Sequence, residues 1–171
     1  MALDSMQEIF DKAAAGGIPF WRVVLETDME QRQVTEEQSL EKMGVTWRAM
    51  LESVTDYQGT ERSRSGLAGG DGEKMRRYIE SGSGLCGAYL REVVATALSV
   101  GESNACMRKI VAAPTAGACG VLPAVLVPLY QAGMVSEEQI IQALYTASGI
   151  GAVIGYRACI AGAAGGCQAE I

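Results

Sequence analysis

The spacing of apolar residues is the feature that most constrains how this chain can fold. Over the longer segments apolar residues recur at intervals of three and four, whereas the apolar–polar alternation of half-buried strands is scarce. Aromatic residues, which favour strands, account for only 6% of the chain. The sequence therefore predicts an all-α fold.

Length and composition favour a single compact domain. The chain has 171 residues, of which 49% are hydrophobic and 20% charged, and this is enough to bury a core. We expect residues 1–171 to form one domain, with amphipathic helices over residues 1–58 and helices rich in small residues over residues 59–171. Because alanine and glycine let backbones approach closely, the second part is expected to form the buried centre.

Capping and breaking residues predict where the first helices begin and end. The first helix should start at Asp4 or Ser5, either of which can act as its N-cap, and end before Gly16. Pro19 is suited to open the next helical segment, which extends over about residues 20–57.

The later helix boundaries follow from similar signals. The 20–57 segment should divide near Thr35, because Thr35 and Gln38 have the spacing of a capping box. Four further helices are expected over residues 71–80, 87–101, 117–132 and 136–153. Pro123 should distort the third of these four, because a proline inside a helix removes a backbone hydrogen bond.

The last segment, residues 155–171, mixes glycine with alanine and is too flexible for an exposed helix of its own. It stops at Ile171 without a capping or terminating signal. We therefore expect that the chain has been cut inside a domain and that this segment needs neighbours to fold.

Charge and hydropathy exclude two classes of partner. The formal net charge is −6 and the densest basic group is the short run of Lys74, Arg76 and Arg77, so nucleic-acid binding is not expected. No segment reaches the roughly eighteen apolar residues that a membrane span requires. The N-terminus is acidic and lacks the basic and apolar regions of a secretory signal, so we expect a cytoplasmic protein.

Histidine is absent and the cysteines are scattered. Without histidine, acid–base chemistry near neutral pH needs another group. No two cysteines form a Cys-x-x-Cys pair, which argues against a disulfide framework or a zinc ribbon. The five cysteines are Cys86, Cys106, Cys119, Cys159 and Cys167. Reduced thiols fit better, and most of them are expected to be buried as small apolar side chains.

The first of three glycine-rich motifs, motif 1, is Ser65-Gly66-Leu67-Ala68-Gly69-Gly70-Asp71. The pair Gly69-Gly70 permits positive φ, and Asp71 can cap the following helix, so a plain helix start after a loop is one interpretation. In the other interpretation, bare backbone N–H groups around Ser65, Gly66 and the glycine pair receive a small carboxylate at a helix N-terminus. Asp71 could then orient an ammonium group or act as a base.

Motif 2, Ala113-Pro114-Thr115-Ala116-Gly117, again places proline, a hydroxyl and glycine before an apolar helix. This is an anion-accepting arrangement, although a plain N-cap by Thr115 explains it equally well. Motif 3, residues 162–170, places the Cys167 thiol among glycines, where a bulky ligand could approach the backbone closely. One thiol by itself cannot hold a metal cluster.

In this order and at this spacing, the three motifs resemble the α chain of bacterial iron-sulfur-dependent L-serine dehydratases (L-serine ammonia-lyases). The strings that carry the resemblance are Ser-Gly-Leu-Ala-Gly-Gly-Asp, Ala-Pro-Thr-Ala-Gly and Gly-Gly-Cys-Gln-Ala-Glu. The similarity extends from about Ile18 to Ile171, and motif 3 is its most specific part.

The resemblance implies a cofactor, a reaction and a set of site residues. Cys167 matches one of three cysteine ligands of a [4Fe-4S] cluster, and the other two lie outside this chain. The open iron of the cluster acts as a Lewis acid on the β-hydroxyl of L-serine, so no pyridoxal phosphate is needed. Residues 65–71 and Pro114–Gly117 are expected to hold the amino acid, with Asp71 as the candidate catalytic group. The resemblance also implies a β subunit or β domain and assembly into a homo- or hetero-oligomer.

The sequence departs from the family pattern at several positions. Ser65 and Ala68 stand where the family has threonine, and residues 157–163 replace a stretch that is more polar in the family. Because small polar groups discriminate one amino acid from another, a related cluster-dependent lyase acting on L-cysteine is the first alternative. The second alternative is a non-catalytic helical scaffold, and the isolated chain is expected to be inactive.

Overall fold

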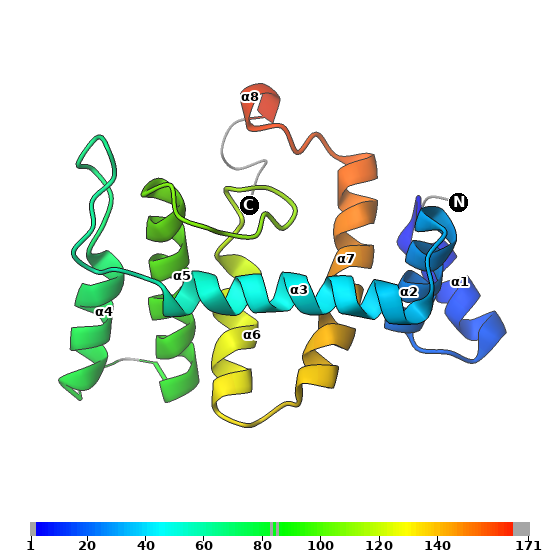
Figure 1. Cartoon of the computed structure of the whole chain (residues 1–171), viewed down its shortest axis with the longest axis horizontal. Helices are drawn as coiled ribbons and strands as arrows, with labels where there is room; N and C mark the ends of the chain where they lie inside the picture. The colour runs from blue at the N-terminus through cyan, green and yellow to red at the C-terminus, as the bar shows by residue number, and fades with distance from the viewer. Residues whose placement is uncertain (1–2, 83, 85, 166–171) are drawn as a thin grey trace. The chain divides into compact units, whose positions relative to one another are not determined.

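The computed structural model describes residues 3–82, 84 and 86–165, and all of their regular structure is helical (Figure 1). This confirms the predicted all-α fold class. The helices are α1 (Met6–Gly16), α2 (Phe20–Arg32), α3 (Glu36–Thr55), α4 (Asp71–Glu80), α5 (Ala88–Ala105), α6 (Val121–Gln131), α7 (Glu137–Arg157) and α8 (Gly162–Gly165). None of the described helices combines the length and apolar character needed to cross a membrane.

Polar caps fix the helix starts at the predicted places. The Ser5 hydroxyl accepts a hydrogen bond from the N–H of Glu8, so Ser5 is the N-cap of α1. Thr35 and Gln38 exchange both bonds of a capping box before α3. Ser136 and Gln139 form a second capping box at the start of α7.

The described chain forms two compact units. Unit 1 comprises residues up to Trp47 and those from Ser136 onward, and unit 2 comprises Arg48–Val135. Helix α3 contributes its first part to unit 1 and its last part to unit 2. The predicted division at residue 58 into an amphipathic part and a small-residue part stays a prediction.

In unit 1, α2 packs against both α1 and α7. Their apolar faces form one buried cluster, because each helix carries apolar residues at helical spacing. Its buried members are Leu3, Ile9, Val23, Val24, Leu25, Tyr145 and Val153.

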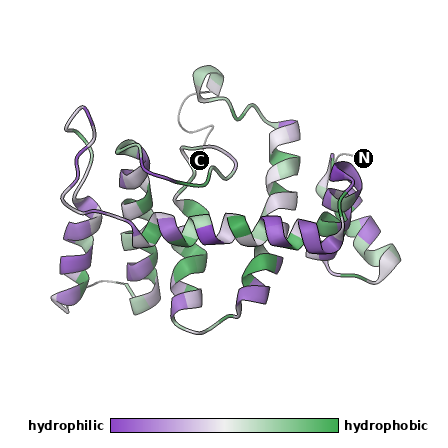
Figure 2. Ribbon diagram, in the orientation of Figure 1, coloured by the Kyte–Doolittle hydropathy of each residue, from purple (hydrophilic) through white to green (hydrophobic). Residues whose placement is uncertain are grey.

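In unit 2, α5 packs against α4 on one side and α6 on the other. Ala95 and Val100 of α5 and Ala124 and Val127 of α6 are buried, and small side chains let these helices approach closely. Figure 2 shows α6 as mostly hydrophobic and α4 as mostly hydrophilic. Helix α5 therefore packs between the apolar helix α6 and the more polar helix α4.

Two sequence predictions are wrong. Helix α6 begins at Val121 rather than at 117, so Pro123 lies in the first turn, where no intrahelical N–H bond is lost. The internal proline is Pro128.

The cysteines also differ from expectation. Among the four in the described residues, only Cys119 is buried, whereas Cys86 and Cys159 are exposed and Cys106 is intermediate. The reason is their position. Cys86 lies in the segment between α4 and α5, and Cys159 lies after the end of α7, so neither is on the core-facing side of a helix. Cys167 lies outside the described residues.

Candidate active site

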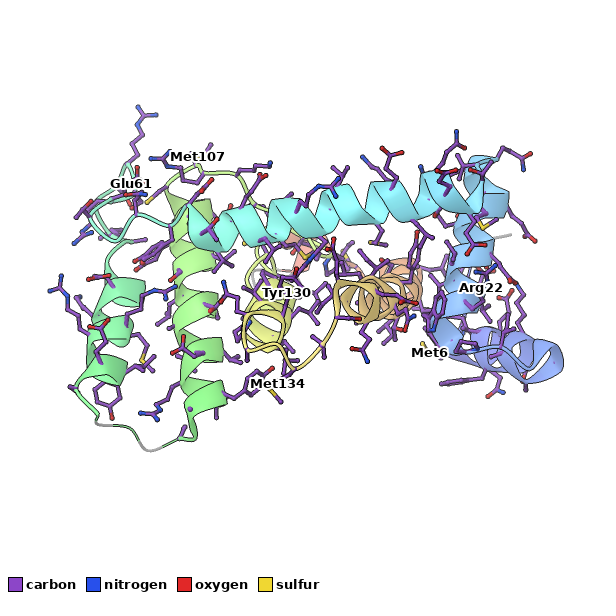
Figure 3. The ribbon with its side chains drawn as sticks, turned by 60° about the horizontal axis from the view of Figure 1, so that its bottom comes forward. Met6, Arg22, Glu61, Met107, Tyr130 and Met134 are labelled. Carbon is purple, nitrogen blue, oxygen red and sulfur yellow. The ribbon has the colours of Figure 1, made fainter. Side chains whose placement is uncertain are left out.

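Motifs 1 and 2 lie at the same end of unit 2, where α4 begins, α5 ends and α6 begins (Figure 1). The chain after α5 is tied to the segment before motif 1, because the Arg108 guanidinium pairs with the Glu61 carboxylate through two nitrogens. Figure 3 shows Glu61 and Met107 on these neighbouring segments. A second ion pair joins Lys109 to Glu52 at the end of α3.

Motif 1 is a tight loop that only glycine can complete. The Ser63 N–H donates to Ala68 O at 2.9 Å, and the Gly66 N–H donates to Ser63 O at 2.8 Å. Gly69 adopts φ 128°, and a Cβ there would lie 2.3 Å from Glu61 O, so a side chain at this position is excluded. Ser65 and Gly66 at the tip are exposed, and Gly70 is buried.

The first N–H groups of α4 are already occupied. The Glu102 carboxylate, from α5, accepts from Asp71 N at 2.6 Å and from Gly72 N at 3.2 Å. The Tyr57 hydroxyl accepts from Glu73 N at 3.2 Å and donates to Glu102 Oε2 at 2.5 Å. These three donors are therefore not available to a substrate carboxylate while Glu102 holds its place.

Burial shapes the chemistry of this group. Glu102 is only 8% exposed, and the positive end of the α4 dipole and its N–H groups compensate for the burial of its carboxylate. Burial, with the hydrogen bond to Glu102, raises the pKa of Tyr57 to about 12. The phenol therefore keeps its proton and stays a donor at any physiological pH.

Asp71, the candidate catalytic residue, points to solvent. Its carboxylate forms an ion pair with Lys74 Nζ at 2.8 Å, and its side chain is 61% exposed. The neighbouring Lys74 ammonium holds the pKa of Asp71 below its ordinary value. Asp71 is therefore ionised, and its carboxylate is paired with the Lys74 ammonium.

Motif 2 is held from the same helix as motif 1. The Asn104 side-chain amide, in the last turn of α5, donates to Ala116 O at 3.1 Å. The Thr115 hydroxyl accepts from Ala118 N at 3.4 Å and closes a turn before α6, but the N-cap of α6 is Gly120, so the prediction that Thr115 caps this helix is wrong. Pro114, Ala116 and Gly117 are exposed, so their backbone can be reached from solvent.

Sequence reasoning missed four residues at this end of unit 2. Glu102, Tyr57 and Asn104 hold the loops, and Arg62 lies so close to Gly70 that a Cβ built there would be 2.8 Å from Nη2. Arg62 donates to two backbone carbonyls and forms no ion pair with any residue in the described ranges. The available signal was the spacing of Glu102, an acid on the same face of α5 as the small residues Ala95 and Ser99.

The described residues do not form a cluster site by themselves. No group of three or more histidine, cysteine, aspartate or glutamate side chains among them could hold a metal ion. Burial raises the pKa of the Cys119 thiol, which disfavours the thiolate that a metal needs. The predicted ligand, Cys167, belongs to the part of the chain that the structure does not describe.

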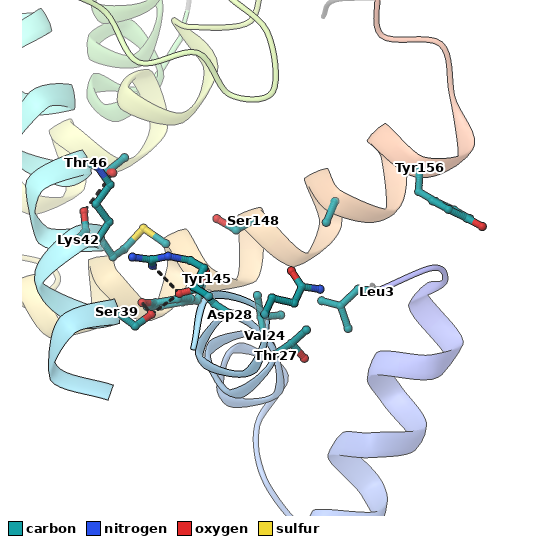
Figure 4. Close-up of a pocket in the computed structure, with 14 residues that line it drawn as sticks. Leu3, Val24, Thr27, Asp28, Ser39, Lys42, Thr46, Tyr145, Ser148 and Tyr156 are labelled. Atoms are coloured by element: carbon teal, nitrogen blue, oxygen red, sulfur yellow. Dashed lines mark hydrogen bonds and ion pairs between the residues drawn. The ribbon is translucent and has the colours of Figure 1, made fainter. Parts of the chain in front are cut away.

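Unit 1 contains a separate hollow of about 490 Å³ (Figure 4). At its wall the Ser39 hydroxyl donates to Asp28 at 2.5 Å and bonds to the Tyr145 hydroxyl at 2.7 Å. Arg32 pairs with the same carboxylate at 2.8 Å. These polar groups satisfy one another, so the network joins α2, α3 and α7 within the unit.

The comparisons with known proteins agree with the motifs. A family model described as "Serine dehydratase alpha chain" matches residues 15–171. The probable L-serine dehydratase, alpha chain, of Bacillus subtilis (strain 168) is 38% identical over 87% of this chain and 50% of its own. The L-serine dehydratase, alpha chain, of Peptoniphilus asaccharolyticus is 36% identical over 98% of this chain and 58% of its own.

The chain thus spans 50% and 58% of the length of these two relatives. No solved structure matches it. The family match covers both motif loops that unit 2 brings together and continues through motif 3. The chain belongs to the serine dehydratase alpha chain family.

Proposed function

We propose that this chain supplies the amino-acid-binding loops of an L-serine dehydratase. The reaction removes the Cα proton and the β-hydroxyl of L-serine as one molecule of water and leaves aminoacrylate, whose imine form hydrolyses to pyruvate and ammonia. The observation that carries the proposal is the family match over both motif loops, together with their position at one end of unit 2.

The proposal assigns the amino acid to the two motif loops. Ser65, Gly66, Gly69 and Gly70 of motif 1 are proposed to bind it, together with the four residues of motif 2. Those four are Pro114, Thr115, Ala116 and Gly117. Asp71 is ionised, so it can orient the substrate's ammonium group or accept a proton.

Arg62 is the proposed partner of the substrate's carboxylate. The α4 N–H groups are bound to Glu102 and Tyr57, so the carboxylate needs another donor. A guanidinium is suited to the task because its planar donors match the two oxygens. Arg62→Ala is expected to raise KM for L-serine, whereas Arg64→Ala, an exposed arginine in the same loop, is the matched control. Equal KM values for the two variants would show that Arg62 does not bind the substrate's carboxylate.

The proposed cofactor is a [4Fe-4S] cluster with Cys167 as one ligand. Because the described residues do not complete a ligand set, this part of the proposal depends on the sequence resemblance at motif 3 and on ligands from outside the chain. Cys167→Ala should abolish the visible absorbance of the anaerobically purified protein, and Cys159→Ala, an exposed cysteine nearby, should preserve it. An unchanged spectrum for Cys167→Ala would refute the assignment.

The proposed partners are a β subunit or β domain and further copies in an oligomer, and the proposed location is the cytoplasm. The two relatives are themselves named alpha chains, which supports a second kind of chain. Size-exclusion chromatography with light scattering of the protein purified from its natural source tests this. A monomer of a single chain without a β domain would contradict it.

The central experiment measures pyruvate and ammonia released from L-serine by the anaerobically purified natural protein. Equal amounts of the two products are expected. The altered stretch 157–163 favours L-cysteine as the alternative substrate, for which sulfide would accompany pyruvate. A higher kcat/KM for L-cysteine than for L-serine would make L-cysteine the proposed substrate. Inactivity on both amino acids would favour the non-catalytic scaffold. The 171-residue chain alone is expected to be inactive.

A further inference from the structure

The last turn of α5 contacts both motif loops through two side chains. Glu102 accepts from the backbone N–H groups of Asp71 and Gly72, which directly follow Gly70 of motif 1. Asn104, two residues later, donates to Ala116 O of motif 2. One helical turn therefore contacts two loops that are far apart in the sequence, since the last residue of motif 1, Asp71, and the first of motif 2, Ala113, lie 42 positions apart.

We propose that Glu102 is a positioning residue of the dehydratase: its carboxylate fixes motif 1 to α5 in the register that lets both loops hold the same substrate. This inference rests on the proposed function. Glu102 does not touch the substrate in this proposal, because its carboxylate oxygens are directed to the start of α4 and to Tyr57.

The arrangement requires a side chain with two hydrogen-bond-accepting oxygens at this position. Glu102 accepts three hydrogen bonds, from two N–H groups and one phenol. Glutamine has the same shape, but its amide nitrogen would face a donor and leave one N–H group without an acceptor. Aspartate keeps the charge but is one methylene shorter, so it cannot reach the same donors from α5.

The surroundings leave little room for an alternative arrangement. Gly72 lies against Tyr57 and against Ser99, one turn before Glu102, and a Cβ on Gly72 would be 2.7 Å from Ser99 Oγ. Tyr57 remains a donor because its pKa is raised to about 12. Loss of the carboxylate would therefore release the start of α4 instead of being compensated by a neighbour.

The test compares Glu102→Gln with Glu92→Gln in the anaerobically purified natural protein. Glu92 is an exposed acid on the same helix and is the matched control. We expect kcat/KM for L-serine to fall by roughly tenfold to a hundredfold in Glu102→Gln, because small displacements of substrate-holding groups have effects of this size. Most of the loss should appear as a higher KM, since the loops are proposed to bind the substrate.

A second readout does not depend on catalysis. Hydrogen exchange of the backbone amides of Asp71, Gly72 and Glu73 should become on the order of tenfold faster in Glu102→Gln and remain unchanged in Glu92→Gln. Tyr57→Phe keeps the ring and removes one of the three donors to the carboxylate. It should shift KM and exchange in the same direction by a smaller factor, and it replaces Glu102→Gln if that variant does not fold.

The outcomes separate the two proposals. Wild-type turnover of L-serine with an unchanged KM in both variants would overturn the positioning role and leave the proposed function in place. Lower thermal stability with wild-type kinetics would do the same, because it would show a structural role only. Absence of lyase activity in the wild type would overturn the proposed function and the positioning role with it. Faster amide exchange in Glu102→Gln would then show only that Glu102 holds the start of α4.

Discussion

Replacing Gly72 by alanine tests whether the start of α4 is as tightly packed as the structure indicates. A Cβ at Gly72 would lie 2.7 Å from Ser99 Oγ and 2.9 Å from the Tyr57 hydroxyl oxygen. Neither oxygen can withdraw without cost, because Ser99 Oγ donates to Ala95 O and the Tyr57 hydroxyl bonds to Glu102. One of these contacts must shift to admit the methyl group.

Overpacking of this kind destabilises a protein by about 1–3 kcal/mol. The gain in helix propensity offsets little of this, because Gly72 is the second residue of α4 and not an interior one. For a chain of this length, about 2 kcal/mol corresponds to a fall in Tm of roughly 4–8 °C. Thermal unfolding followed by circular dichroism at pH 7 measures the change.

Gly101→Ala is the matched control, for which the expected change in stability has the opposite sign. Gly101 lies inside α5, and a Cβ built on it meets no atom within 4 Å. The substitution should stabilise the protein by about 0.5–1 kcal/mol, because glycine is a poor residue in a helix interior. A Gly72→Ala variant that is as stable as Gly101→Ala would refute the packing described around Tyr57 and Ser99.

Three further predictions concern single side chains. Met107 adopts the left-handed conformation with φ 62°, which is strained for a residue with a side chain. Met107→Gly should therefore stabilise the protein by about 1 kcal/mol in urea unfolding, and an unchanged unfolding midpoint would contradict this. Ser39→Ala should destabilise by about 1–3 kcal/mol, because the Tyr145 hydroxyl would lose its buried partner, and Ser39→Ala in a Tyr145→Phe background should have a smaller effect. The Arg22 guanidinium lowers the pKa of Glu36 below its ordinary value of 4.5, so this pair stabilises the fold above that pH and the contribution is lost as pH falls through the lower folded value. Glu36→Gln should therefore reduce the dependence of Tm on pH in the acid range, and identical pH profiles would rule the contribution out.

Local signals predicted the helices well. The capping box of Thr35 and Gln38 and the N-cap Ser5 are short-range features, and each interaction that they predict is present. Periodicity predicted the all-α class for the same reason, since it depends on neighbours three and four residues apart. Pro123 was misjudged because its effect depends on whether α6 begins two or six residues before it, which capping signals did not define.

The contacts that hold the candidate site are long-range. Glu102 bonds to residues that lie 30 and 31 positions away in the sequence, and Tyr57 lies 45 positions from Glu102. The glycines of motif 1 predicted an open helix N-terminus for an anion, and nothing in their spacing indicated that a side chain of the protein itself would supply that anion. Only the packing of α4 on α5 brings the two together.

The spacing of residues along α5 contains a signal that could have predicted the role of Glu102. Ala95, Ser99 and Glu102 are spaced by four and three residues, so they share one helix face, and all three are buried. Two small residues followed by an acid on a core-facing stripe imply a buried carboxylate, and a buried carboxylate requires donors. The glycine-rich start of α4 is a source of such donors in the same chain, because its N–H groups have no intrahelical acceptor. The same glycines that make motif 1 resemble a substrate loop thus also leave the first N–H groups of α4 open to the carboxylate of Glu102.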